Sequence, residues 1–319
     1  MDNSFIEALE NHDLRALENI PKGNMHSHAG KGANVNFLER KTGAKIGKPK
    51  SYFYSLEAMH QWYSQNIGIY CKGIWGLLLR WEGCFAEAQR DSVSVMVQSF
   101  SLDAVKDVGG MKNLMNILEI FHQKYCPDTL FLPELTFPRS CDIGRVMNSV
   151  EEILSYDYFR SLDICFDEFA QPIHKFKSIY RVCEEKGMVI KAHVGEFGEP
   201  DDVIEAVETL HLQEIYHGIS AAKSKNAMKW LQDKNIVLNL CPTSNLYMGL
   251  VVSYANHPIR KLYDNGICVT ICTDDLLIFQ SSLSEEYLKL YESGLMTAAE
   301  LDDIRKNTLA DAVQRRYRV

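Results

Sequence analysis

Histidines and carboxylates follow three short apolar segments of this sequence, in an arrangement that could bind a metal ion. One segment ends in His26-Ser27-His28, a second in His193-Val194-Gly195-Glu196 and a third in Thr273-Asp274-Asp275. Alternation along a strand would turn both imidazoles of the first motif to one face. Neutral imidazole and carboxylate oxygen suit a zinc-type divalent ion. Neighbouring acids and a further histidine, His217, could move protons to and from an activated water, so the chemistry indicated is metal-assisted hydrolysis.

Eight apolar segments of β-forming composition alternate with helical stretches along the chain. The strands are expected to end near His26–His28 and to cover Ser92–Phe100, Thr129–Phe137, Phe159–Phe166, Met188–Val194, Glu214–His217, Ile236–Cys241 and Ile267–Thr273. Alternating βα units imply parallel strands, and eight of them imply a closed (β/α)8 TIM-type barrel in the α/β class. A doubly wound open sheet is the structural alternative.

Two further segments account for a length above the ~250 residues typical of such a barrel. They are an N-terminal helix over Ser4–Asn19 and a helical stretch between His28 and Leu56. Because no composition shift or linker divides the chain, residues 1–319 are expected to form one domain. The aromatic-rich stretch Tyr52–Phe85 is interpreted as core packing, with a lid or a subunit contact as alternatives.

Each polar motif stands at the end of its own predicted strand, and in a barrel these ends meet on one face, where active sites lie. A lone His-x-His is as often a structural pair as a ligand pair, and a lone Asp-Asp is usually a solvated turn. Two more strand ends carry His217-Gly218 and Cys241-Pro242-Thr243-Ser244-Asn245. The joint occurrence favours a functional site at the C-terminal face of the strands.

Composition and charge narrow the class of protein. The 319 residues carry 34 Lys plus Arg against 42 Asp plus Glu, a net charge of −8, which disfavours binding to a nucleic-acid polymer. No apolar run approaches a membrane span, and Met1–Ser4 lacks the pattern of a secretory signal. The nine cysteines lack a Cys-x-x-Cys pair and are interpreted as free thiols. We expect a cytoplasmic enzyme.

Taken together, the motifs resemble those of the adenosine deaminase family within the metal-dependent amidohydrolase superfamily. The similar elements are Pro21-Lys22 before His26-Ser27-His28, then His193-Val194-Gly195-Glu196, His217-Gly218, Cys241–Asn245, His257-Pro258 and Thr273-Asp274-Asp275, in family order. The likeness covers roughly residues 18–290 and is most specific from residue 190 onward. His257, which precedes a proline and a helical stretch, is interpreted as a helix cap.

The resemblance implies one Zn²⁺ per subunit, with His26, His28, His193 and Asp274 as its ligands. His217 would orient the attacking water, and Glu196 would give a proton to the ring nitrogen beside the attacked carbon. Asp275 would share a hydrogen bond with another ring nitrogen. The implied reaction is hydrolytic deamination of an adenine nucleoside or its 5′-monophosphate, or an N6-modified form, to the inosine-type product and ammonia.

Three positions depart from the family pattern and bear on the substrate. Gly30 stands where adenosine enzymes usually carry the Asp that binds a ribose hydroxyl, and Phe166 stands where they usually carry a Gly. Leu276 replaces a proline after Asp274-Asp275, which we interpret as a loop detail. The predicted substrate-binding residues are Gly30, Lys31, Phe166, Gly195 and Asp275.

The segment Ala29–Lys50 is basic in an otherwise acidic chain. Its charged residues are Lys31, Arg40, Lys41, Lys45, Lys48, Lys50 and Glu39. Loss of the hydroxyl-binding Asp and gain of a glycine-flanked Lys31 suggest that a 5′-phosphate binds here, because glycines admit close approach and an ammonium complements phosphate. The alternative is a solvated loop face.

Two other functions stay open at this stage. One is a deaminase or cyclic-amide hydrolase acting on another purine-like or pterin-like ring. The other is a catalytically silent nucleotide sensor that keeps the fold. In each case the expected partner is a small purine nucleoside or nucleotide, with neither a nucleic-acid polymer nor a membrane, and the chain could form a homo-oligomer or be a subunit of a larger system.

Overall fold

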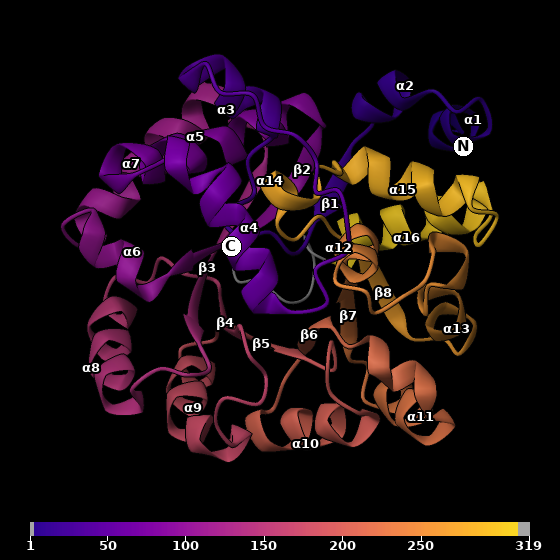
Figure 1. Ribbon diagram of the computed structural model, residues 1–319. Helices are drawn as coiled ribbons and strands as arrows, with labels where there is room; N and C mark the ends of the chain where they lie inside the picture. Colours follow the sequence, from indigo (N-terminus) through magenta and orange to yellow (C-terminus); the bar gives the residue numbers. More distant parts are fainter. Residues whose placement is uncertain (1–2, 312–319) are drawn as a thin grey trace.

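The computed structural model describes residues 3–311, and its centre is a barrel of eight parallel strands in the order β1 to β8 (Figure 1). The strands are β1 Lys22–Asn24, β2 Val93–Ser101, β3 Leu130–Pro138, β4 Ser161–Cys165, β5 Val189–Val194, β6 Glu214–His217, β7 Val237–Leu240 and β8 Cys268–Ile271. The expected (β/α)8 architecture is confirmed. The ring closes because Ser27, just after β1, forms a parallel bridge with Asp274, just after β8.

The first strand is shorter than the sequence predicts. It ends at Asn24, and the chain then runs on through two isolated bridges, Ser27 with Asp274 and His28 with Ser99. The two predicted ligands His26 and His28 therefore lie in an extended segment that leaves the regular sheet.

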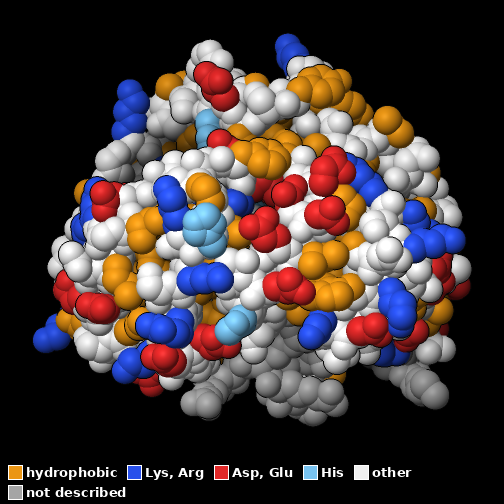
Figure 2. Space-filling view, turned by 90° about the horizontal axis from the view of Figure 1, so that it is seen from below, with side chains coloured by type: hydrophobic (Ala, Val, Ile, Leu, Met, Phe, Trp, Pro, Cys, Tyr) orange, Lys and Arg blue, Asp and Glu red, His pale blue; other side chains and the backbone are white. Residues whose placement is uncertain are grey.

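Helices surround the barrel on its outside (Figure 1). In chain order, the helical segments are α1 Ser4–Glu10, α2 Leu14–Glu18, α3 Val35–Thr42, α4 Leu56–Asn66, η1 Gly68–Tyr70, α5 Gly73–Arg90, α6 Leu102–Asp107, α7 Met111–Tyr125, α8 Ile143–Leu154, η2 Ile173–Phe176, α9 Lys177–Glu185, α10 Pro200–Leu210, η3 Ile219–Lys223, α11 Lys225–Asp233, α12 Pro242–Tyr247, η4 Tyr254–Asn256, α13 Ile259–Asp264, α14 Leu276–Phe279, α15 Leu283–Glu292 and α16 Ala298–Asp311. Acidic and basic side chains are interspersed on the face seen in Figure 2. Across residues 3–311, every helix is too short or too polar to pass through a bilayer.

The N-terminal helix predicted over Ser4–Asn19 is instead two helices, α1 and α2. The break falls where His12 adopts a left-handed backbone with φ 52°, a conformation that ends a right-handed helix. Asp13 then starts α2, because its side chain accepts a hydrogen bond from the backbone N–H of Ala16 at 3.0 Å.

The aromatic-rich stretch Tyr52–Phe85 has two roles in the fold. Trp81 and Phe85 on α5 are buried in the main apolar core, as expected. Helix α4, from the same stretch, lies across the mouth of the barrel, where Met59 and His60 line the central cavity (Figure 1). The core-packing interpretation therefore holds for α5, whereas α4 covers the site.

The interior of the barrel is polar below the strand ends. Lys191 on β5 lies 3.2 Å from a carboxylate oxygen of Glu134 on β3 and 3.4 Å from one of Glu214 on β6. Its ammonium also donates to the hydroxyl of Tyr216 at 3.0 Å, and that hydroxyl donates to both Glu134 oxygens at 2.7 Å. All these side chains are buried, so their charges are compensated by pairing inside the barrel.

Candidate active site

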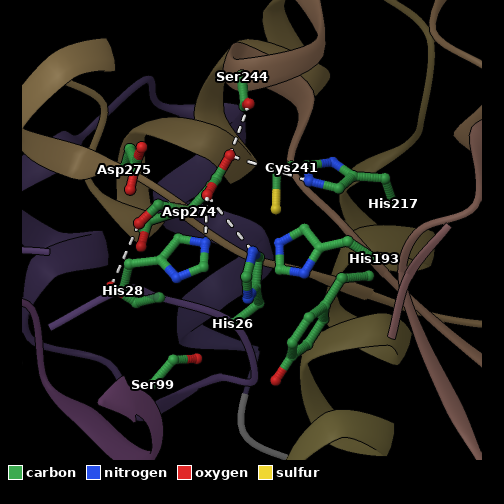
Figure 3. Close-up of polar contacts among 12 residues, drawn as sticks. His26, His28, Ser99, His193, His217, Cys241, Ser244, Asp274 and Asp275 are labelled. Carbon is green, nitrogen blue, oxygen red and sulfur yellow. Dashed lines mark hydrogen bonds and ion pairs between the residues drawn. The ribbon is translucent and has the colours of Figure 1, made fainter. Parts of the chain in front are cut away.

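The sequence-predicted ligands and proton-transfer residues come together at the C-terminal ends of the strands (Figure 3). His193 lies on β5 and His217 ends β6, while the segments after β1 and β8 bring the other ligands. A cavity of about 190 Å³ opens over them and is lined by His28, Gly30, Lys31, Phe166, His193, Glu196, His217, Asp274 and Asp275, among others. His26 lies beneath this lining with no exposed surface.

Three imidazoles and one carboxylate form a compact donor cluster. One ring nitrogen from each of His26, His28 and His193 falls in a group whose members all lie within 4.8 Å of one another. Asp274 Oδ1 is 3.4 Å from His26 Nε2 and 3.5 Å from His28 Nε2. Nitrogen and carboxylate donors at this spacing match the ligand set of a zinc-type ion.

The buried ring of His26 provides an independent test of that fit. Neither of its nitrogens has a hydrogen-bond partner, although both are inaccessible to solvent. Burial lowers the pKa of His26 well below its ordinary value, so the ring is neutral, which is the form that binds metals. An unpartnered buried nitrogen is costly, and a metal ion would remove that cost for the nitrogen that binds it.

His193 is oriented by a carboxylate that the sequence reasoning did not single out. Asp163 on β4 lies 3.0 Å from His193 Nδ1, and it accepts a hydrogen bond from the hydroxyl of Thr136 at 2.9 Å. This leaves Nε2 of His193 as the nitrogen available to a ligand. The signal in the sequence that could have identified this carboxylate is an aspartate between the apolar residues Leu162 and Ile164 of a predicted strand.

Asp274 is held in place by both its side chain and its backbone. The hydroxyl of Ser244 donates to Asp274 Oδ2 at 2.7 Å, and the backbone N–H of Asp274 donates to the carbonyl of His26 at 3.2 Å. Asp274 has a left-handed φ of 57°, which non-glycine residues adopt at a cost. The Ser of the Cys-Pro-Thr-Ser-Asn motif thus positions the predicted metal ligand in the segment that follows the next strand, β8.

His217 also has a left-handed backbone, with φ 63°. In a regular strand, the neighbours Tyr216 and His217 would point to opposite faces. The left-handed conformation lets both rings approach His26, whose ring centroid lies 3.8 Å from that of Tyr216 and 5.8 Å from that of His217. Asn245 donates its amide to His217 Nδ1 at 3.1 Å, which leaves Nε2 to carry the ring proton. That Nε2 lies 3.7 Å from Glu196 and 4.0 Å from Asp274.

His257 supports His217 through Asn245. Its Nε2 lies 3.1 Å from Asn245 Oδ1, while its Nδ1 accepts a hydrogen bond from the backbone N–H of Ile259. The second contact satisfies the first backbone N–H of the following helix, α13, although the N-cap residue of that helix is Pro258 and not His257. The first contact adds a role that the sequence did not reveal. Burial lowers the pKa of both His217 and His257 to about 3, so both imidazoles of this hydrogen-bonded series are neutral.

Glu196 lies in the loop after β5, and its side chain is only 11% exposed. Burial, followed by the charge of Asp274, raises the pKa of Glu196 well above its ordinary value, which favours the protonated carboxyl group. Glu168 fixes the loop by accepting hydrogen bonds from the backbone N–H groups of Gly195, Phe197 and Gly198. The N–H of Gly195, a predicted substrate contact, is therefore donated to Glu168 at 2.7 Å.

Lys31, on which the phosphate hypothesis depends, lines the cavity. Its ammonium contacts Asp275 Oδ2 at 2.7 Å inside the cavity. The other cations of the basic segment, Arg40, Lys41, Lys45, Lys48 and Lys50, are exposed and do not line the cavity. The solvated-face alternative therefore describes those five residues. Phe166, which replaces the family glycine, has φ 69° and borders the cavity with 48% of its surface exposed.

Two comparisons of the sequence with known proteins point to one family. The family described as Adenosine deaminase matches residues 147–316. A provisionally named adenosine/adenine deaminase of Treponema pallidum is 27% identical over 285 residues, which is 89% of this chain and 95% of that protein.

Two solved structures share the fold. A zinc-bound amidohydrolase of Burkholderia ambifaria superposes with a TM-score of 0.76 at 19% identity, over 92% of this chain and 86% of that one. The N6-methyl-AMP deaminase of Arabidopsis thaliana superposes with a TM-score of 0.75 at 15% identity, over 93% of each chain.

Proposed function

This chain belongs to the adenosine deaminase family and is a hydrolytic deaminase of an adenine-type substrate, and we propose that it acts on an adenine nucleoside or its 5′-monophosphate with one zinc ion per subunit. The observation that supports the zinc ion is the buried His26, whose two ring nitrogens lack partners within a cluster of imidazole and carboxylate donors. A zinc-bound structural neighbour is consistent with that choice of ion.

The residues that would hold zinc are His26, His28, His193 and Asp274. Their donor atoms lie close enough together to bind one ion. Asp163 is not a ligand itself, but it orients the ring of His193 through a hydrogen bond. When bound, zinc supplies Lewis acidity that lowers the pKa of the attacking water and stabilises negative charge as the water adds. Every other step that we propose is carried out by side chains of this chain.

Glu196 is proposed as the proton donor to the ring nitrogen beside the amino-bearing carbon. A carboxyl group can serve as an acid at neutral pH only if its surroundings favour the protonated form, and burial of Glu196 shifts its pKa in that direction. The neutral His217 points Nε2 towards the same region, where it can orient the water and donate to developing negative charge. Of the two protons of the attacking water, one restores the proton that Glu196 gave to the ring nitrogen and the other goes to the amino group. The C–N bond then breaks, ammonia leaves, and a carbonyl group remains on the ring.

The two forms of the substrate differ in the group attached to the sugar. Gly30 brings no acceptor for a ribose hydroxyl to the cavity wall, and a Cβ at this position would meet open space. The 5′-monophosphate is the second candidate, because the structural neighbour from Arabidopsis acts on N6-methyl-AMP. Against it, Lys31 is the only Lys or Arg that lines this cavity among the described residues, and it is already paired with Asp275.

Ammonia release from a panel of adenine, adenosine, deoxyadenosine, AMP, dAMP and their N6-methylated forms tests the proposal. We expect turnover of a nucleoside or nucleotide together with about one zinc per chain by metal analysis. Turnover limited to the free base would contradict the proposed substrate. Absence of bound zinc in an active enzyme would contradict the proposed cofactor.

A further inference from the structure

Lys31 places a positive charge inside the cavity, directly on Asp275. The ammonium is 2.7 Å from Asp275 Oδ2, and the two side chains are 17% and 4% exposed. Although burial favours loss of the proton, the Asp275 carboxylate raises the pKa of Lys31, so the group remains an ammonium. A fully hydrogen-bonded ammonium needs three acceptors.

The surroundings of Lys31 leave it with an unused donor. Besides Asp275, its Nζ lies 3.4 Å from Nε2 of His60, and the rings of Tyr63 and Phe166 are 5.8 Å and 5.9 Å away at their centroids. Burial and the charge of Lys31 lower the pKa of His60 to about 4, so His60 is a neutral acceptor. The third N–H is therefore available to a bound molecule.

The Lys31–Asp275 pair and Glu196 lie on different sides of the predicted metal ligands. Glu196 is beside His217, at 3.7 Å, whereas Asp275 groups with His28 and Asp274 within 4.8 Å. Figure 3 shows Asp275 and His217 on opposite sides of Asp274. In adenine, the ring nitrogens N1 and N7 also lie on opposite sides of the amino-bearing carbon. If Glu196 serves N1, then N7 is presented to Lys31 and Asp275.

The chemistry of N7 determines which of the two side chains can bind it. In a nucleoside or nucleotide of adenine, N7 carries a lone pair and no hydrogen, so it needs a donor. The ion-paired carboxylate of Asp275 offers lone pairs, whereas the ammonium of Lys31 offers N–H groups.

We propose that Lys31 is the residue that recognises the imidazole edge of the substrate, by donating a hydrogen bond to N7, and that Asp275 positions its ammonium. This inference rests on the proposed function, because it assumes an adenine ring held with N1 at Glu196. The ammonium also withdraws electron density from the ring, which favours attack by water at the amino-bearing carbon. In this proposal Lys31 therefore binds the adenine ring and not a 5′-phosphate.

The proposal is tested by replacing N7 of the substrate and by removing the ammonium group of Lys31. The best substrate of the panel is compared with its 7-deaza analogue, in which a C–H replaces N7. For the wild type we expect kcat/KM to favour the N7 compound by about tenfold to a hundredfold, the range for a hydrogen bond to a charged group. In Lys31→Met this preference should fall to about one.

A matched control and a second variant separate the possible causes. Lys45→Met removes an exposed cation of the same basic segment and should keep the wild-type preference. Lys31→Arg retains a donor and should keep part of it. An unchanged N7 preference in Lys31→Met would overturn the proposal. The same holds if Lys31→Met no longer discriminates between AMP and adenosine but retains the preference for N7.

Binding provides a readout that does not depend on turnover. Calorimetry with purine riboside and 7-deazapurine riboside should show the same N7 preference in the wild type and its loss in Lys31→Met. If the panel yields no adenine-type substrate, the proposed function fails. If adenine nucleosides are turned over or bound but the N7 preference does not depend on Lys31, only the present inference fails.

Discussion

The ring of Tyr216 lies stacked on the ring of His26, with 3.8 Å between centroids and 26° between planes. The hydroxyl of Tyr216 is held from below by Lys191 and by both oxygens of Glu134. The polar interior of the barrel thus supports the floor of the candidate metal site. A predicted ligand without hydrogen bonds of its own is positioned by packing against a side chain that is itself hydrogen-bonded.

Tyr216→Phe should destabilise the fold while keeping the stack on His26. The change removes one donor from the buried Glu134, which is expected to lower the free energy of unfolding by about 1–3 kcal/mol. Urea denaturation measures this difference. Tyr70→Phe, at a position with 38% exposure, is the control and should change the free energy of unfolding little. Equal effects at the two positions would contradict the role given to the buried network.

Asp163→Asn should weaken metal binding. Asp163 fixes the orientation of His193 through Nδ1, and loss of such a partner typically costs tenfold to a hundredfold in metal affinity. Competition with a chromophoric chelator gives the zinc dissociation constant. Asp103→Asn, which alters an exposed ion pair with Arg145, should leave that constant unchanged. Zinc binding as tight in Asp163→Asn as in the wild type would exclude this positioning role.

Glu196→Gln should abolish turnover without loss of metal. Gln has the size of the acid but cannot give up a proton, so kcat is expected to fall by about 10²–10⁴, the range for general acid catalysis. Ammonia release and metal analysis of the same sample separate the two effects. The control is Glu185→Gln on the exposed end of α9. Full turnover by Glu196→Gln would remove this residue from the mechanism.

The rate should fall on the alkaline side of its pH profile. The active form of Glu196 is protonated, and burial together with Asp274 raises its pKa above the ordinary value. Above that raised pKa the carboxylate form dominates, so kcat should decrease about tenfold for each further pH unit. The residual activity of Glu196→Gln should lack this decrease. Persistence of the same alkaline limb in the variant would assign it to another group.

Removal of the metal should lower stability as well as activity. A ligand present at one hundred times its dissociation constant stabilises a protein by about 2.7 kcal/mol, and a chelated protein loses that contribution. Differential scanning calorimetry before and after chelation measures the shift in Tm. Zinc should restore both Tm and turnover, whereas Mg²⁺ should not, because it prefers oxygen ligands. Full activity after complete chelation would contradict a metal-dependent reaction.

The barrel and the residues at its strand ends could be predicted from the sequence because both depend on local patterns. Seven of the eight strands fall where apolar, β-forming segments indicate them. The break at His12 could not be predicted, because it depends on a single backbone angle. The early end of β1 could not be predicted either, because the residues after Asn24 make only isolated bridges to Ser99 and Asp274, far away in the sequence.

The partners of the site residues were harder to infer. Lys31 and Asp275 are separated by 244 positions, and their contact follows from how the first and last strands meet. Glu168 reaches the loop of Glu196 from the neighbouring strand connection, and the sequence shows only an acidic pair after β4. In both cases the residue types were visible, but their pairing depends on tertiary packing.

The seam of the barrel has a consequence for the order in which the protein can become functional. The bridge that closes the ring joins Ser27, which lies between the predicted ligands His26 and His28, to Asp274, which is itself a predicted ligand, so an ion would be held partly across this seam. During synthesis, the three histidines of the cluster leave the ribosome before Asp274, so at that stage they lack the carboxylate ligand. The full set of predicted ligands would therefore exist only after the eighth strand has been made, and a bound ion would then link the segments that follow β1 and β8.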